Sequence, residues 1–159
     1  MWRSALVTLA FAVAVAPAAV AQRAIEWQVQ AIGTAATARF LGGGVGFGVR
    51  TSGRTRLALT VSAGDLSREP IVQGAARRHD VAGRAELFAS YHLSPFRRRG
   101  VSPYAGGGVA VAATSQDMFE YVLLAIGIET APGGPRGWFA EVGIGGGVRG
   151  SIGFRIRRR

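Results

Sequence analysis

The sequence predicts an all-β fold, an eight-stranded antiparallel up-and-down barrel, for the chain that follows its first 21 residues. Eight segments of about ten residues each carry apolar side chains on one face and polar side chains or glycine on the other, which is the period of a β-strand. Turns rich in glycine, proline and serine separate these segments. After Gln22, no apolar run approaches the roughly 20 residues that a membrane helix requires.

The alternation is clearest in four segments. In 24–33, Ile25 and Trp27 alternate with Glu26 and Gln28, so that the two faces of the strand differ in polarity. The same pattern predicts strands over 55–63, 81–93 and 148–156.

Four further segments fit the period less regularly and complete the count of eight. These are 39–50, 103–112, 119–130 and 137–146, and one face of each is made largely of glycine or other small residues. Glu129 and Glu141 are single carboxylates on this small-residue face of the last two.

The first 21 residues have the layout of a secretory signal peptide. A short basic stretch that contains Arg3 precedes an apolar run, and the run ends in Ala19, Val20 and Ala21, a small-residue cleavage site. The alternative is a membrane anchor. We predict removal of 1–21, which leaves an exported barrel domain over 22–159.

The composition excludes several kinds of chemistry. All 19 basic residues are arginine, and the chain has no cysteine, with a net charge of +10. A phosphate-binding lysine, a Schiff-base lysine, thiolate zinc sites, disulfides and thiol nucleophiles are therefore excluded.

Alternation alone does not show which face of the barrel meets lipid. Three features favour a transmembrane barrel with its apolar face outward. Glycines crowd the polar face, short turns alternate with a longer predicted loop over 64–80, and aromatic residues gather near one rim as an interfacial girdle would. The girdle residues are Trp27, Tyr91, Trp138 and Phe154. The alternative is a soluble periplasmic barrel that holds an apolar ligand inside.

Four stretches carry a resemblance to a known family. They read SPYAGGGVAV over 102–111, GIET over 127–130, GWFAEVGIGGG over 137–147 and, at the end, VRGSIGFRI. In these stretches the chain resembles the small outer-membrane β-barrel proteins, the OmpA/OmpX-like group. The resemblance covers essentially all of 22–159 and implies a monomer in the outer membrane, surrounded by its lipids and inserted by the barrel-insertion machinery.

Charged residues on the polar face are expected to pair inside the barrel, because an unpaired buried charge is costly. Strands one and eight close the barrel, which predicts that Glu26 lies beside Arg155 and that Glu141 shares this arginine. A barrel of eight strands is only just wide enough for side chains to fill, so a salt-bridge plug is favoured over a gated pore. The predicted network is Glu26, Arg56, Arg84, Glu86, Glu129, Glu141, Arg149 and Arg155, with Arg50 on the same face.

The spacing of the candidate residues does not favour a catalytic site. His92, Ser90 and Glu86 share one face and suggest a lipid-modifying hydrolase, but residues two apart on a strand are separated by nearly 7 Å. The two histidines have no metal-ligand spacing, and the glycine runs lack a nucleotide-binding pattern. We therefore predict no catalytic residue, no metal and no cofactor.

Arginine clusters are expected at one rim, facing the periplasm. Basic residues near a membrane surface attract anionic head groups, while a solvated rim that hinders backward insertion is the alternative. An exported chain seldom meets nucleic acid, which is not expected as a partner. The rim residues are Arg97, Arg98, Arg99, Arg157, Arg158 and Arg159. The sequence thus predicts a non-enzymatic protein with a structural or membrane-integrity role and at most minor permeability.

Overall fold

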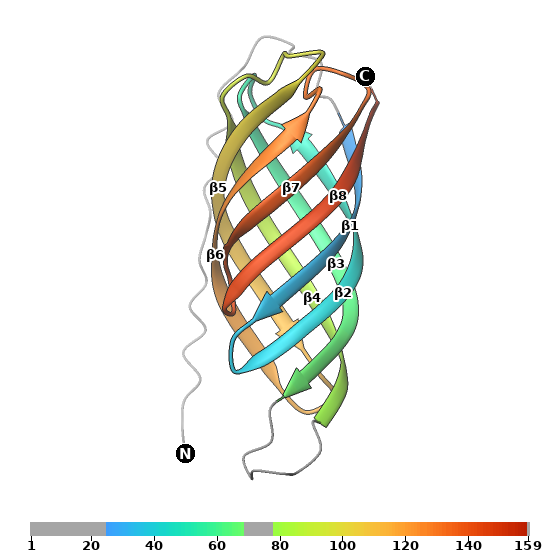
Figure 1. The fold of residues 1–159 in the computed structure, drawn as a ribbon, viewed down its shortest axis with the longest axis vertical. Coiled ribbons are helices and arrows are strands. Elements are labelled where there is room, and N and C mark those ends of the chain that lie inside the picture. The colour runs from blue at the N-terminus through green and yellow to red at the C-terminus, as the bar shows by residue number, and fades with distance from the viewer. Residues whose placement is uncertain (1–24, 69–77, 159) are drawn as a thin grey trace, which may run out of the picture.

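The computed structural model describes residues 25–68 and 78–158 and shows one closed barrel of antiparallel strands (Figure 1). The strands follow one another around the barrel in chain order, and the last pairs with the first. This is the predicted up-and-down barrel. The predicted signal peptide over 1–21 and Arg159 lie outside the described residues.

Each of the eight predicted segments is a strand, because the alternating residues place one face of each segment inside and the other outside. The strands are β1 (Ile25–Ala35), β2 (Ala38–Arg50), β3 (Thr55–Arg68), β4 (Arg78–His92), β5 (Val101–Ala113), β6 (Met118–Thr130), β7 (Arg136–Ile144) and β8 (Val148–Arg158).

The prediction of a loop over 64–80 is wrong at both of its ends. β3 continues to Arg68 and β4 begins at Arg78. Gly64 pairs with Gly42 across the β2–β3 ladder, and a Cβ on Gly64 would collide with the backbone of β2, so glycine allows the strands to pair closely there. On the outside, the imidazole Nδ1 of His79 lies 2.9 Å from a carboxylate oxygen of Asp65 and joins the extended ends.

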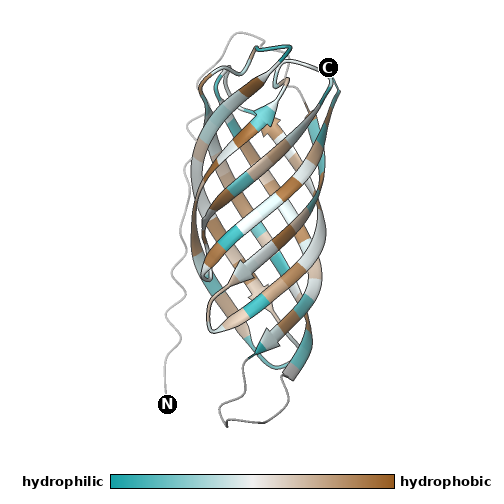
Figure 2. Cartoon of the chain, viewed as in Figure 1, coloured by the Kyte–Doolittle hydropathy of each residue, from teal (hydrophilic) through white to brown (hydrophobic). Residues whose placement is uncertain are grey.

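The outer face of the barrel is apolar. Leu41 and Val122 are each 71% exposed, and brown residues alternate with teal or pale residues along the strands in Figure 2. Polar and charged side chains are buried on the inner face instead. A soluble barrel with an apolar interior requires the opposite arrangement, so that alternative is wrong. Within residues 25–68 and 78–158, no helix is long and apolar enough to cross a membrane.

The barrel has two different rims (Figure 1). The terminal rim, at the top of Figure 1, holds the start of β1, the end of β8 and the turns over 51–54, 93–100 and 131–135. The far rim holds the turns over 36–37, 114–117 and 145–147.

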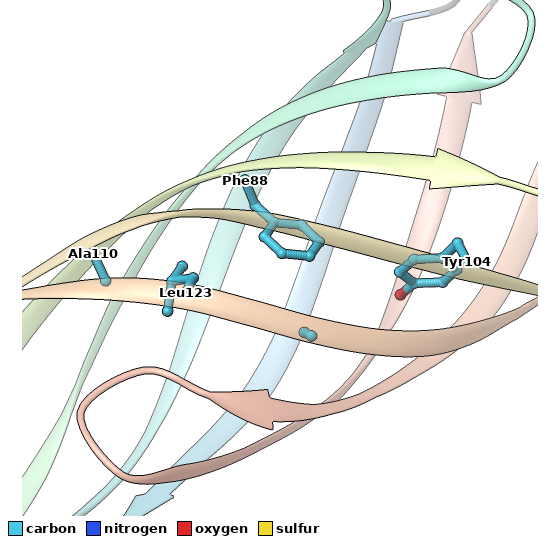
Figure 3. Close-up of a cluster of buried hydrophobic side chains, with 5 residues drawn as sticks. Phe88, Tyr104, Ala110 and Leu123 are labelled. Carbon is cyan, nitrogen blue, oxygen red and sulfur yellow. The ribbon is translucent and has the colours of Figure 1, made fainter.

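Small residues on the inner wall make room for large side chains opposite them. A Cβ on Gly48 would lie 2.6 Å from the Arg56 guanidinium, and one on Gly127 would lie 2.5 Å from the Tyr104 ring. Apolar side chains from β4, β5 and β6 also pack against one another inside the barrel (Figure 3). This cluster comprises Phe88, Tyr104, Ala110, Leu123 and Ala125. The glycines predicted to line a narrow lumen therefore provide the space in which its side chains pack.

Candidate functional site: the charged lumen

Glu26 on β1 is the centre of a charge cluster near the terminal rim. Its carboxylate accepts hydrogen bonds from the Nε atoms of Arg50 at 2.9 Å, Arg56 at 2.6 Å and Arg157 at 3.1 Å. Glu26 is fully buried, and its three partners come from β2, β3 and β8. Several cations around one carboxylate compensate for its loss of water.

A second cluster lies closer to the far rim. The Glu86 carboxylate accepts from Arg84 Nε and from Arg149 Nη2, each at 2.7 Å. Arg149 Nη1 also donates to Glu141 at 3.0 Å. The cluster joins β4, β7 and β8 through buried side chains.

Arg155 connects the two clusters. Its Nη2 lies 3.2 Å from Glu141, and its Nη1 lies 3.3 Å from Glu129. Glu129 in turn contacts Arg157, which belongs to the Glu26 cluster. The Arg155 guanidinium also stacks over the Phe139 ring at 3.9 Å. The lumen therefore contains an unbroken chain of ion pairs between Arg84 and Arg50.

All eight residues of the predicted network face the lumen and are buried, none more than 8% exposed. The predicted partner of Glu26 is wrong, however. The β1–β8 register places Arg157 opposite Glu26 and Arg155 opposite Gln28. Arg155 Nε accordingly donates to the Gln28 side chain at 3.2 Å. The expectation that Glu141 binds Arg155 agrees with the structure.

Arg157 corrects the predicted basic rim. The terminal arginine run predicts a rim position for Arg157, but its side chain is 4% exposed and points inward. The period of β8 carried the signal, because Arg157 has the same parity as Arg149 and Arg155. The sequence analysis also missed Tyr104, which donates to Glu141 at 2.7 Å.

The turn over 131–135 covers the terminal end of the network. Arg157 Nη1 donates to the Gly134 carbonyl at 3.0 Å, and Arg50 Nη2 donates to the Pro132 carbonyl at 3.3 Å. Pro132 is among the most buried side chains, and Ala131 adopts a φ of 46°. A left-handed backbone conformation is unfavourable at a non-glycine residue, so the contacts around Ala131 must hold this turn in place.

Ser90 and His92 lie closer together than their spacing predicts. Ser90 Oγ is 3.2 Å from His92 Nε2, and both side chains lie on the inner face. His92 Nδ1 lies 3.4 Å from Glu129, whereas Glu86 contacts arginines. The distance argument against this pair is therefore wrong. Ser90 is 2% exposed and His92 is fully buried, so neither side chain is open to solvent.

The girdle and rim residues lie where the strands begin or end. Trp27, Tyr91 and Trp138 are outward-facing and about half exposed near the terminal rim, and Phe154 packs edge-on against Trp138 at 5.4 Å. Arg97, Arg98, Arg99 and Arg158 are exposed at the same rim. Their interfacial and lipid-binding roles remain predictions. Among the described residues, no three His, Asp or Glu side chains converge as a metal site requires.

Solved structures of other proteins have a fold similar to that of this barrel. The N-terminal β-barrel domain of Pseudomonas aeruginosa OprF aligns with a TM-score of 0.54 and 17% identity over 84% of this chain and 97% of that one. Neisserial surface protein A aligns with a TM-score of 0.58 and 13% identity over 84% of this chain and 96% of that one.

The outer membrane protein OprG from Pseudomonas aeruginosa aligns with a TM-score of 0.58 and 11% identity over 86% of this chain and 96% of that one. This chain has the fold of the small eight-stranded outer-membrane β-barrels. No family model and no curated protein sequence matches it. The comparison therefore identifies the fold of this barrel and not its role.

Proposed function

We propose that the chain is a monomeric, non-enzymatic outer-membrane protein with a structural or membrane-integrity role. Two observations support this proposal. Every strand contributes large exposed apolar side chains to the outer surface, which lipid stabilises better than water does. The fold is also that of barrels from outer membranes.

We further propose that the resting lumen is closed to ions and solutes, with at most minor permeability. The observation that supports closure most strongly is the chain of ion pairs between Arg84 and Arg50. It is continuous, its members come from β1, β2, β3, β4, β6, β7 and β8, and Arg50, with a side chain 13% exposed, is its least buried member. Each charge holds its neighbours in place, because an unpaired buried charge is strongly unfavourable.

In this proposal the terminal rim faces the periplasm. Residues 1–21 direct export, and the barrel-insertion machinery and outer-membrane lipids are the partners. Exposed Arg97, Arg98, Arg99 and Arg158 then lie near the inner leaflet, where each basic residue gains about 1 kcal/mol from anionic head groups.

Localisation with extractability tests the proposal. The full chain is produced in a double-membrane bacterium, the membranes are separated, and the outer-membrane fraction is run on a gel with and without boiling. We expect a band that needs detergent for extraction and whose mobility changes on boiling. A chain lacking 1–21 is the matched control and should stay in the cytoplasm. A full chain recovered in the soluble periplasmic fraction would contradict the proposal.

A further inference from the structure

A cavity opens at the far rim, at the opposite end of the barrel from Glu26 and its arginine partners. It has a volume of about 310 Å³ and lies between the ends of β1 to β6 and the β7–β8 turn, with most of its wall apolar. We call it the mouth cavity. A space of this size accommodates one small molecule.

The floor of the mouth cavity is apolar. Phe40 and Ala82 line it and pack with Ile32 in one buried cluster, and Leu66 packs against this cluster. These side chains lie on β1, β2, β3 and β4. The apolar body of a ligand would therefore replace water over a surface that binds water poorly.

One side of the cavity is an aromatic wall. The rings of Phe119 and Tyr121 on β6 stack with centroids 6.4 Å apart and planes 19° apart. Gly146 lines the cavity beside the Tyr121 ring with a φ of 80°, and a Cβ there would approach the ring to 3.0 Å. Glycine at this turn thus allows the left-handed backbone conformation and leaves room for the ring.

Two arginines bring positive charge to the same wall. The Arg84 guanidinium lies 5.6 Å from the Tyr121 ring centroid, and the Arg68 guanidinium lies 5.8 Å from that of Phe119. Arg84 is buried and held by Glu86 and by the Gly145 carbonyl. Arg68 instead pairs at 2.9 Å with Asp117, and both side chains of this pair are about one-third exposed or more. An exposed pair of this kind contributes little stability, so another carboxylate can replace Asp117 at small cost.

We propose that the mouth cavity binds a small aromatic carboxylate. The ring of the ligand would pack on the Phe119 and Tyr121 wall and over the apolar floor. Its carboxylate would bind the Arg68 guanidinium, in place of Asp117 or beside it, with Arg84 as a fixed second cation. Aromatic stacking and a guanidinium–carboxylate contact are complementary in geometry. This inference does not rest on the closed lumen, because the cavity opens at the far rim.

A titration followed by fluorine NMR tests the proposal. The probe is 4-fluorobenzoate, added to the full barrel over 22–159 in lipid nanodiscs, with empty nanodiscs correcting for partition into lipid. The neutral 4-fluorobenzamide and the cationic 4-fluorobenzylammonium have similar shapes. We expect saturable binding of the benzoate, binding of the benzamide at least tenfold weaker, and no saturable binding of the ammonium. Equal binding of all three probes, or none of any, would overturn the proposal.

Matched variants locate the site. Ala112 is a half-buried wall residue on the inner face of β5, and Ala105 faces outward on the same strand. Ala112→Phe should abolish benzoate binding, while Ala105→Phe should leave it unchanged. Arg68→Gln tests the charge near the rim and should weaken benzoate binding about tenfold without altering benzamide binding. Benzoate binding that survives both Ala112→Phe and Arg68→Gln would show that the site lies elsewhere.

Discussion

Arg157 on β8 lies directly across the barrel seam from Glu26 on β1, and its Nε is 3.1 Å from the Glu26 carboxylate. The pair links the first and last strands through side chains inside the barrel. It adds to the backbone hydrogen bonds of the β1–β8 ladder. Because Glu26 also binds Arg50 and Arg56, one carboxylate organises the terminal half of the lumen.

Glu26→Gln should lower the free energy of unfolding by about 3–5 kcal/mol, since it removes the charge that compensates three arginines. Urea titration of the folded barrel in lipid vesicles, followed by tryptophan fluorescence, measures the change. Glu120→Gln is the control, because Glu120 is an exposed carboxylate on β6 and its loss should change stability by less than about 0.5 kcal/mol. Equal effects of the two substitutions would show that the buried cluster does not stabilise the barrel.

Alanine substitutions at two glycines of β2 distinguish the effect of side-chain packing in the lumen from the effect of backbone conformation. Gly48→Ala should cost about 1–3 kcal/mol, because its Cβ would lie 2.6 Å from the Arg56 guanidinium. Gly43→Ala on the outward face should cost nothing, since the nearest atom to its Cβ is 3.9 Å away. The same unfolding titration compares them. If Gly43→Ala proves as costly as Gly48→Ala, the glycines of β2 serve the backbone and not the lumen packing.

Ser90 should not react with a fluorophosphonate, although His92 lies 3.2 Å away as a base would. The reason is burial, since both side chains lie inside the barrel wall with almost no exposed area. Mass spectrometry of the folded barrel after exposure to the reagent checks this. Labelling that disappears in Ser90→Ala and in His92→Ala would revive the hydrolase interpretation.

Trp27 and Trp138 should lie near the membrane interface, since both face outward near the terminal rim. They are the only tryptophans of 22–159. In vesicles, lipids brominated close to the head group should quench their fluorescence more than lipids brominated near the chain end. Trp27→Phe and Trp138→Phe report each residue separately. Stronger quenching from the chain end would place the girdle in the middle of the bilayer instead.

The fold was largely predictable because strand period is a local property of the sequence. Ile25, Trp27 and Val29 alternate with polar residues such as Glu26, so the sequence separates the two faces of the strand. The region around Gly64 was less predictable. There the polar Asp65 faces outward and the apolar Leu66 faces inward, whereas in the rest of β3 apolar residues face outward. The polarity pattern therefore stops predicting the strand before the strand ends.

The composition of the charged lumen was more predictable than its pairing. Parity alone places Glu129 and Arg155 on the inner face, but the partner of each charge depends on the register between strands and on side-chain reach. A two-residue error in the β1–β8 register assigned Glu26 to Arg155 instead of Arg157. The contact between Ser90 and His92 depends on rotamers, which the sequence does not reveal.

Single-channel recording in planar bilayers tests the closed lumen most directly. The wild-type barrel is compared with Arg155→Ala, which removes the connection between the two charge clusters, and with Arg54→Ala at the exposed terminal rim as the control. We expect no stable conductance steps from the wild type or from Arg54→Ala, and clear steps from Arg155→Ala. A wild-type barrel that conducts steadily, with the same conductance in Arg155→Ala, would contradict a lumen closed by its arginine and glutamate pairs.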